Sequence, residues 1–231
     1  MTTDEILKEL NLLKDENYKN FNIKNIPTKQ KIIGVRIPIL KKTAQKISLN
    51  DYVNFIYSDK HNIFELIMLE GLTLSYLKKN FSVLQEDIEN YINKVDNWAQ
   101  IDYVFQNFKS VKKEKEVVLK TIKKMAASKN EFEVRAALVL LLTFFIEKEY
   151  INNIFEISNK ISNKDYYSLT ANAWLISICM YKFPNDTMNF IKDKKLDSKT
   201  LKLTIRKIKE SLLFKKEKYS NIKKFVSEFS P

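Results

Sequence analysis

The sequence has very few of the residues that build tight turns, disulfides and metal sites. Only 2 of its 231 residues are glycine and 4 are proline, which leaves little of the turn chemistry that β-hairpins need. A single cysteine, Cys179, cannot form an internal disulfide, and its apolar neighbours predict a buried, unreactive thiol. A single histidine, His61, leaves no His/Cys cluster for a metal ion. We therefore expect an all-α protein with no metal and no cofactor.

Long apolar segments and targeting signals are also missing. The longest apolar run, from Ala136 to Ile146, is broken by Thr143 and reaches only about half of the roughly 20 residues that cross a bilayer. The N-terminus, from Met1 to Glu5, is polar and partly acidic, unlike a signal or transit peptide. These features predict a cytoplasmic protein without a membrane partner, and we expect it to be a monomer.

The residues that are present follow a helical period along nearly the whole chain. A first helix is predicted from Thr2 to about Lys14, followed by a linker over 17–33 without a clear period. The segment Gly34-Val35-Arg36-Ile37-Pro38 then leads into a helix that ends near Ile47. Further helices are predicted over roughly 50–58, 62–79, 82–94, 98–108, 111–127, 131–148, 150–161, 165–183, 185–193, 198–213 and 215–228.

Several of these helices carry recognisable start signals. Capping-box spacing joins Thr2 to Glu5, Ser82 to Gln85 and Asn130 to Glu133, and the predicted N-caps also include Asp51, Asp165 and Asp197. The helices pair with a period of roughly 35–45 residues, which is typical of HEAT-like or armadillo-type repeats. We predict one domain over 1–231: a superhelical solenoid over 34–231 with a concave basic groove, and an N-terminal helix and linker over 1–33 packed on it.

The charge is strongly positive, with 40 basic and 28 acidic residues and a formal net charge of +12. This balance suggests a polyanionic partner, although biased codon usage in a sequence rich in Lys, Ile and Asn could also produce it. The only arginines are Arg36, Arg135 and Arg206. Their planar forks suit phosphate or carboxylate. Lys41 and Lys42 lie on the polar side of the helix that follows Pro38.

The helix that begins near Trp98 carries the most specific combination of side chains. Ile101, Val104, Phe105 and Phe108 form its apolar stripe. Trp98 and Asp102 are one turn apart and project together from one flank, so that an acid lies beside an aromatic face. This pair suits a flat, cationic ligand with developing charge. A tryptophan at the edge of the core with a solvated aspartate is the plainer interpretation.

Three segments recur at about the repeat spacing: Trp98 to Asp102, Glu133-Val134-Arg135-Ala136-Ala137 and Ala171-Asn172-Ala173-Trp174-Leu175. Together with Gly34-Val35-Arg36-Ile37-Pro38, this set resembles the AlkD-type DNA alkylation repair proteins, which are HEAT-like-repeat DNA glycosylases. The similarity extends from the first helix to Ile205-Arg206-Lys207-Ile208. It implies a curved stack of helical repeats that binds duplex DNA.

The resemblance also implies roles for individual residues. Asp102, Trp98 and Trp174 match the catalytic cleft, Arg135 matches an arginine that approaches the DNA, and Arg36, Arg206, Lys41 and Lys42 are further candidates for DNA contact. The implied activity is metal-free excision of cationic alkylpurines, such as 3-methyladenine and 7-methylguanine, while the base stays stacked. Before the resemblance is considered, Trp174 suits a core position equally well, and Arg135 suits an intrahelical pair with Glu131.

This chain also departs from the family pattern. Asn97 stands where the best-known glycosylases of the family have a second tryptophan, Ala99 stands in place of an acid, and the segment Asp165-Tyr166-Tyr167-Ser168 differs. Two other functions therefore stay open: a DNA-binding module without catalysis, and a protein-binding scaffold. The lysines of 109–124 and 199–224 can be DNA contacts or ordinary solvated faces.

Overall fold

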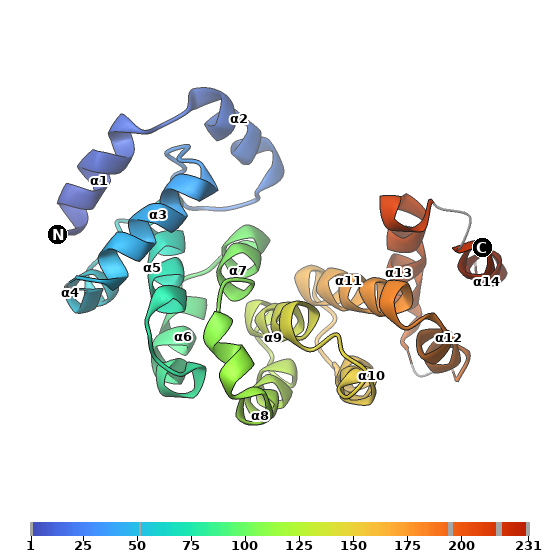
Figure 1. Cartoon of the computed structure of the whole chain (residues 1–231). Coiled ribbons are helices and arrows are strands. Elements are labelled where there is room, and N and C mark those ends of the chain that lie inside the picture. The colour runs from blue at the N-terminus through green and yellow to red at the C-terminus, as the bar shows by residue number, and fades with distance from the viewer. Residues whose placement is uncertain (1, 51, 194–195, 216–218, 230–231) are drawn as a thin grey trace. The chain divides into compact units, whose positions relative to one another are not determined.

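The computed structural model describes residues 2–50, 52–193, 196–215 and 219–229, and within these ranges the chain is helical and has no strand (Figure 1). An isolated bridge joins Lys31 to Ile63. The predicted all-α class is confirmed. The α-helices are α1 (Thr3–Leu12), α2 (Glu16–Asn25), α3 (Ile37–Ser48), α4 (Tyr52–Tyr57), α5 (Phe64–Tyr76), α6 (Gln85–Ile92), α7 (Trp98–Phe105), α8 (Lys115–Ala126), α9 (Glu131–Phe144), α10 (Ile151–Lys160), α11 (Tyr166–Lys182), α12 (Pro184–Lys192), α13 (Ser198–Glu210) and α14 (Ser220–Glu228).

The chain forms two compact units, Met1–Val118 and Leu119–Pro231, and each is described by itself. In the first unit, α5 packs against both α3 and α7, and α4 and α6 also contact α5. Nearly every residue of α5 is buried, as expected for a helix that is apolar on all sides. The single domain expected over 1–231 stays a prediction.

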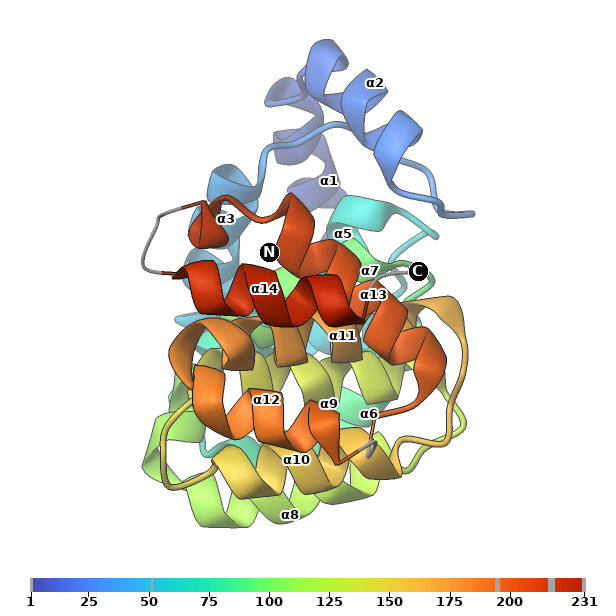
Figure 2. The ribbon, with the colours of Figure 1, turned by 90° about the vertical axis from the view of Figure 1, so that its right-hand side faces the viewer.

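The second unit repeats this arrangement. The central helix α11 packs against α9 and α13, while α10 and α12 lie side by side (Figure 2) and are joined by the stacked rings of Phe155 and Phe190, whose centroids are 4.4 Å apart. In each unit, alternate helices thus form one layer: α3, α5 and α7 in the first unit, and α9, α11 and α13 in the second. The helices between them in sequence, such as α4, α6, α10 and α12, connect the members of the layer. This repeat-like arrangement is the one predicted for a helical solenoid.

The linker predicted over 17–33 is wrong in its first half, because α2 occupies Glu16–Asn25. This helix has no apolar stripe facing the core: Phe21 and Ile23 are 60% and 56% exposed, and the buried side chain is Asn22. Periodicity therefore cannot reveal it. Asp15 defines its start, because the side chain accepts a hydrogen bond from the backbone N–H of Tyr18 at 2.9 Å.

Most of the predicted helix starts are confirmed. The Thr2–Glu5 capping box forms in both directions, and the side chains of Asn130 and Asp197 cap α9 and α13. Asp165 occupies the N-cap position of α11 without a side-chain cap bond.

One predicted start is wrong. The Ser82 hydroxyl donates to Glu114 at 2.6 Å, and a 3₁₀ turn, Phe81–Leu84, precedes α6. The predicted N-cap Asp51 lies outside the described residues, as do residues 216–218 of the helix predicted over 215–228.

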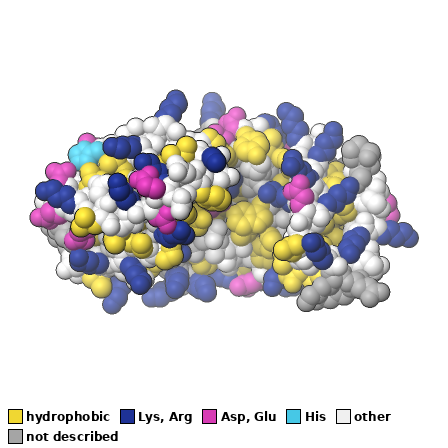
Figure 3. Space-filling model, turned by 90° about the horizontal axis from the view of Figure 1, so that it is seen from above, with side chains coloured by type: hydrophobic (Ala, Val, Ile, Leu, Met, Phe, Trp, Pro, Cys, Tyr) yellow, Lys and Arg dark blue, Asp and Glu magenta, His cyan; other side chains and the backbone are white. Residues whose placement is uncertain are grey.

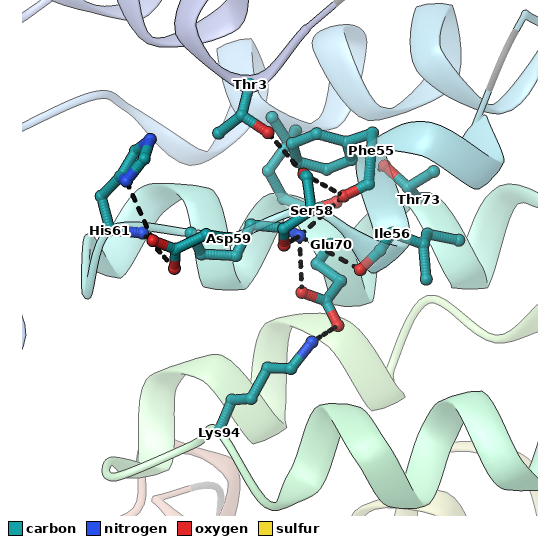
Figure 4. A network of polar contacts seen from close by, with 11 residues as sticks. Thr3, Phe55, Ile56, Ser58, Asp59, His61, Glu70, Thr73 and Lys94 are labelled. Carbon is teal, nitrogen blue, oxygen red and sulfur yellow. Dashed lines mark hydrogen bonds and ion pairs between the residues drawn. The ribbon is translucent and has the colours of Figure 1, made fainter.

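A buried ion-pair network joins α4, α5 and the turn before α7 (Figure 4). Lys60 is 4% exposed, and its ammonium donates to the carbonyls of Phe55, Ile56 and Ser58. Glu70 lies between two ammonium groups, 3.1 Å from that of Lys60 and 2.7 Å from that of Lys94. Burial lowers the pKa of Lys60, and the Glu70 carboxylate opposes that shift. The network therefore fixes the turn that carries Lys94.

The surface of each unit carries many cations. Lysine and arginine side chains are spread across the viewed faces (Figure 3). None of the helices in the described ranges combines the length and the apolar character that a membrane span needs.

Cys179 is fully buried in α11, and burial raises the pKa of its thiol to about 12. Because the thiolate is the reactive form, we expect 5,5′-dithiobis(2-nitrobenzoate) to leave the folded protein unlabelled at about pH 8. After unfolding in guanidinium, one thiol per chain should react. Rapid stoichiometric labelling of the folded protein would contradict this burial.

Replacing Glu70 by Gln removes the negative charge that lies between Lys60 and Lys94. Because it leaves a buried ammonium without its counter-charge, we expect the free energy of unfolding to fall by about 3 kcal/mol or more. Urea denaturation measures this change. Glu86→Gln, at an exposed position of α6, is the matched control and should be close to neutral. Equal stabilities of the two variants would show that the buried pair contributes little.

Candidate functional site

The helix α7 presents Trp98 and Asp102 on one side, as predicted. Trp98 is its first residue and is partly exposed, while Asp102 follows one turn later and is 7% exposed. Ile101, Val104 and Phe105 are fully buried and hold the opposite side against the core. Asp102 therefore lies at the edge of the protein interior, one helical turn from the partly exposed Trp98.

A chain of buried amides holds the first turn of α7. The Asn97 side-chain oxygen accepts hydrogen bonds from the backbone N–H groups of Ala99 and Gln100, at 3.1 and 3.2 Å. The Asn97 amide donates to the Gln100 side-chain oxygen at 2.9 Å. In turn, the Gln100 amide donates to the Gln30 side-chain oxygen at 2.7 Å and to the Phe64 carbonyl at 3.0 Å. We call Gln30, Asn97 and Gln100 the amide chain.

Asp96 ties the same turn to the N-terminal segment. Its carboxylate accepts a hydrogen bond from the Thr28 hydroxyl at 2.6 Å and one from the Lys29 backbone N–H at 2.7 Å. The Gln30 amide donates to the Lys94 carbonyl at 3.1 Å. Residues 28–30 therefore pack directly on the turn that begins α7, although nearly 70 positions separate them in sequence.

A second buried carboxylate shapes the segment Gly34-Val35-Arg36-Ile37-Pro38. Glu65 accepts the backbone N–H groups of Ile33, Gly34 and Val35 at 2.9, 2.7 and 3.3 Å. Burial raises the pKa of Glu65, and these hydrogen bonds oppose the shift. Gly34 has φ +101°, and a Cβ there would lie 2.6 Å from the Cβ of Lys19, so glycine is required at this position.

The predicted DNA contact Arg36 is the N-cap residue of α3, and its side chain already holds an acid. Its Nε and Nη2 donate to one oxygen of Asp15 at 2.9 and 2.7 Å, and the guanidinium lies 5.2 Å from the centre of the Tyr18 ring. The Tyr18 N–H and the Arg36 guanidinium lower the pKa of Asp15. Lys41 and Lys42 follow on α3; Lys41 is partly exposed and Lys42 is exposed.

Tyr18 belongs to the same neighbourhood, but no sequence signal identified it because its helix lacks an apolar stripe. Burial raises the pKa of its phenol, and the neighbouring Tyr103 and Glu65 raise it further. Tyr103 directly follows Asp102 on α7. Tyr18 on α2 therefore lies near both Arg36 at the start of α3 and Tyr103 on α7.

In the second unit, Arg135 joins α9 to α11. Arg135 is 6% exposed, and its Nη1 donates to the Tyr167 carbonyl at 3.2 Å and to the Thr170 hydroxyl at 3.4 Å. Its guanidinium also lies 5.9 Å from the centre of the Tyr167 ring. Trp174 is partly exposed, four residues after Thr170, so both lie on one side of α11. Arg135 and the Trp174 side of α11 therefore form one neighbourhood.

The last predicted DNA contact, Arg206, lies on α13 and is exposed. Its Nε donates to Glu210 at 2.8 Å, which together with the charge of Glu210 raises the pKa of the guanidinium. The structure places the predicted site residues in two groups, one in each unit: Arg36, Lys41, Lys42, Trp98 and Asp102 in the first, and Arg135, Trp174 and Arg206 in the second. Among the described residues, no three His, Cys, Asp or Glu side chains are grouped as metal ligands.

A model of the DNA alkylation repair enzyme family matches residues 6–208, which is most of the chain. The chain belongs to the DNA alkylation repair enzyme family. No curated protein and no solved structure matches it. Membership assigns the chain to enzymes of DNA repair, with DNA as its partner. Of the helices described here, α14 lies wholly beyond the matched residues.

The two departures next to Trp98 have structural explanations in this DNA alkylation repair protein. Asn97 is fully buried and caps α7, so a tryptophan there would remove both the cap and the link to Gln100. Ala99 is fully buried as well, and an acid in its place would lose its hydration without a partner. Both departures therefore fit the buried start of α7.

The contacts of Arg135 lead to a prediction. Replacing Arg135 by Lys keeps the charge but loses the planar guanidinium, whose Nη1 donates to both Tyr167 and Thr170. We expect the free energy of unfolding to fall by about 1 kcal/mol, measured by urea denaturation. Arg206→Lys, at an exposed position, is the control and should leave stability unchanged. If the Arg135→Lys variant is as stable as the parent, the guanidinium group is not needed for the fold.

Proposed function

We propose that this repair protein hydrolyses the N-glycosidic bond of cationic alkylpurines, such as 3-methyladenine and 7-methylguanine, in duplex DNA. The observation that carries the proposal is Asp102, an aspartate that is 7% exposed and lies one helical turn from the partly exposed Trp98. The resemblance to AlkD-type glycosylases supports the same residues, and by that resemblance the base stays stacked during the reaction.

The chemistry suits a site with one acid and no metal. Alkylation at N3 or N7 makes the purine cationic, so the electron pair of the breaking C1′–N9 bond leaves with the base and neutralises it. Positive charge then collects on the deoxyribose, as in glycoside hydrolysis. The oxygen of a water molecule bonds to C1′, and the proton that it loses passes to solvent. The products are a neutral alkylated base and an abasic site.

Asp102 has two parts in this proposal. Its negative charge stabilises the sugar cation, and it orients the attacking water. The indoles of Trp98 and Trp174 favour the cationic base and sugar through their π faces, by roughly 0.5–2 kcal/mol each. Arg135, with Arg36, Arg206, Lys41 and Lys42, holds the phosphates.

Replacing Asp102 by Asn removes the charge and nearly keeps the shape. We expect the single-turnover release of 7-methylguanine from methylated duplex DNA to slow by about 10²–10³-fold, with little change in DNA affinity. Asp59→Asn is the matched control, because Asp59 is an exposed carboxylate of the same unit whose side chain is 79% exposed; it should keep full activity. Equal rates for Asp102→Asn and the parent would remove Asp102 from the mechanism.

The departures at Asn97 and Ala99 favour one other function, a DNA-binding module that has lost catalysis. In that case the parent protein binds duplex DNA with a strongly salt-dependent affinity but releases no base at any protein concentration. If it does not bind duplex DNA even at low salt, it is instead a protein-binding scaffold. The same assays therefore separate all three functions.

A further inference from the structure

We infer that Gln100 is a positioning residue for Trp98 and Asp102, and that it acts through the amide chain with Asn97 and Gln30. This inference rests on the glycosylase proposal for the chemistry, but the geometry on which it depends lies entirely within the first unit. It makes a residue of the N-terminal segment, Gln30, part of the catalytic arrangement. None of the three amides is expected to touch DNA.

The direction of every hydrogen bond in the amide chain is determined by its ends. The Phe64 carbonyl can only accept, so the nitrogen of the Gln100 amide faces it, and the Gln100 oxygen faces Asn97. The backbone N–H groups of Ala99 and Gln100 can only donate, so the oxygen of Asn97 faces them. The two ends of the amide chain therefore require the same arrangement, in which the Asn97 and Gln100 amides each have one possible orientation.

The two amides nearest to Trp98 have no solvent to replace a lost partner. Asn97 and Gln100 are fully buried, and all their side-chain donors have partners: Asn97 also donates to Asp96 at 2.9 Å. Removing the Gln100 amide leaves one N–H of Asn97 and the Gln30 oxygen without their partners in the interior, and it removes one hydrogen bond to the Phe64 carbonyl. Such groups are rarely tolerated, so the first turn of α7 must shift to find new partners.

The position of Trp98 makes such a shift matter for catalysis. Trp98 is the first residue of α7 and lies between the capping residue Asn97 and Gln100, so movement of this turn carries the indole with it. Asp102 accepts the next-turn N–H of Gln106 through its backbone at 3.2 Å and moves with the same helix. Because reaction rates respond to displacements of about 1 Å, a small rotation of α7 slows the reaction without weakening DNA binding.

The partners of the amide chain are themselves held in place. The backbone of Gln100 accepts a hydrogen bond from the Tyr91 hydroxyl at 3.0 Å. Gln30 donates to the carbonyl of Lys94, whose ammonium pairs with Glu70 at 2.7 Å. Thr28 and Lys29 hold the carboxylate of Asp96. These contacts hold the amide chain in one position, and the amide chain in turn holds the turn that carries Trp98.

A fluorescence experiment tests the positioning without any activity. The chain has two tryptophans, so Trp174→Phe leaves Trp98 as the only indole emitter. In that background, we expect Gln100→Leu to shift the Trp98 emission maximum and to change its acrylamide quenching. Asn107→Leu is the matched control: it removes another buried amide of the same unit, one that donates to Ser75 at 2.8 Å beyond the other end of α7. It should leave Trp98 emission unchanged.

A kinetic experiment, in the chain with both tryptophans, tests the consequence. We expect Gln100→Leu and Gln30→Leu each to slow single-turnover release of 7-methylguanine by about 10–100-fold, with DNA affinity within about twofold of the parent. The double variant should be little slower than either single variant, because both break one chain. Gln30→Glu keeps the acceptor for Gln100 and should retain more activity than Gln30→Leu.

The outcomes separate this inference from the proposed function. If Gln100→Leu loses stability but matches Asn107→Leu in Trp98 emission and in rate per folded molecule, the amide chain is only structural and the inference is overturned. If Gln100→Leu does not fold, Gln30→Leu and Gln30→Glu decide the question in the same two assays. If the parent releases no base, the proposed function fails, while the emission of Trp98 still decides whether Gln100 positions it.

Discussion

Buried polar groups need hydrogen-bond partners, and this constraint determines the contacts at the start of α7. A helix begins with backbone N–H groups that have no partner within the helix, and at α7 this end is buried. Asn97 satisfies two of these groups, and its own amide then needs acceptors, which Gln100 and Asp96 supply. The Gln100 amide needs acceptors as well, and the Gln30 side chain and the Phe64 carbonyl supply them. Local capping thus becomes a tertiary connection between the N-terminal segment and the residues proposed to act on DNA.

The alternation of helices decides which residues can act together. In the first unit α5 packs against α3 and α7, and in the second α11 packs against α9 and α13. The predicted site residues all lie on these layers: Arg36, Lys41, Lys42, Trp98 and Asp102 on α3 and α7, and Arg135, Trp174 and Arg206 on α9, α11 and α13. The connecting helices α4, α6, α10 and α12 carry none of them. Because the same packing recurs in both units, the predicted site residues of each unit lie on the helices that form its layer.

The arginines show how a lysine-rich chain uses the guanidinium group. Arg36 holds Asp15, Arg135 holds the Tyr167 carbonyl, and Arg206 holds Glu210. Each contact uses N–H donors of the planar guanidinium, whereas the N–H donors of lysine rotate about a flexible stem. The sequence predicted that the arginines occupy positions where a planar fork matters, and the structure supplies an internal acceptor for each. Contact of the same groups with phosphate remains part of the proposal.

The amino-acid sequence predicted the all-α class, most helix positions and the shared side of Trp98 and Asp102, because each depends on a period of 3.6 residues or on the scarcity of turn-forming residues. It failed at α2, whose apolar side chains Phe21 and Ile23 are exposed, and at the cap expected at Ser82, whose hydroxyl binds Glu114 instead. The packing of the helices was needed to show that Asn97, Gln100 and Gln30 form one chain and that Tyr18 lies near Tyr103. Hydrogen bonds between residues 70 positions apart leave no periodic trace in the sequence, since they depend on how helices pack and not on how each one winds.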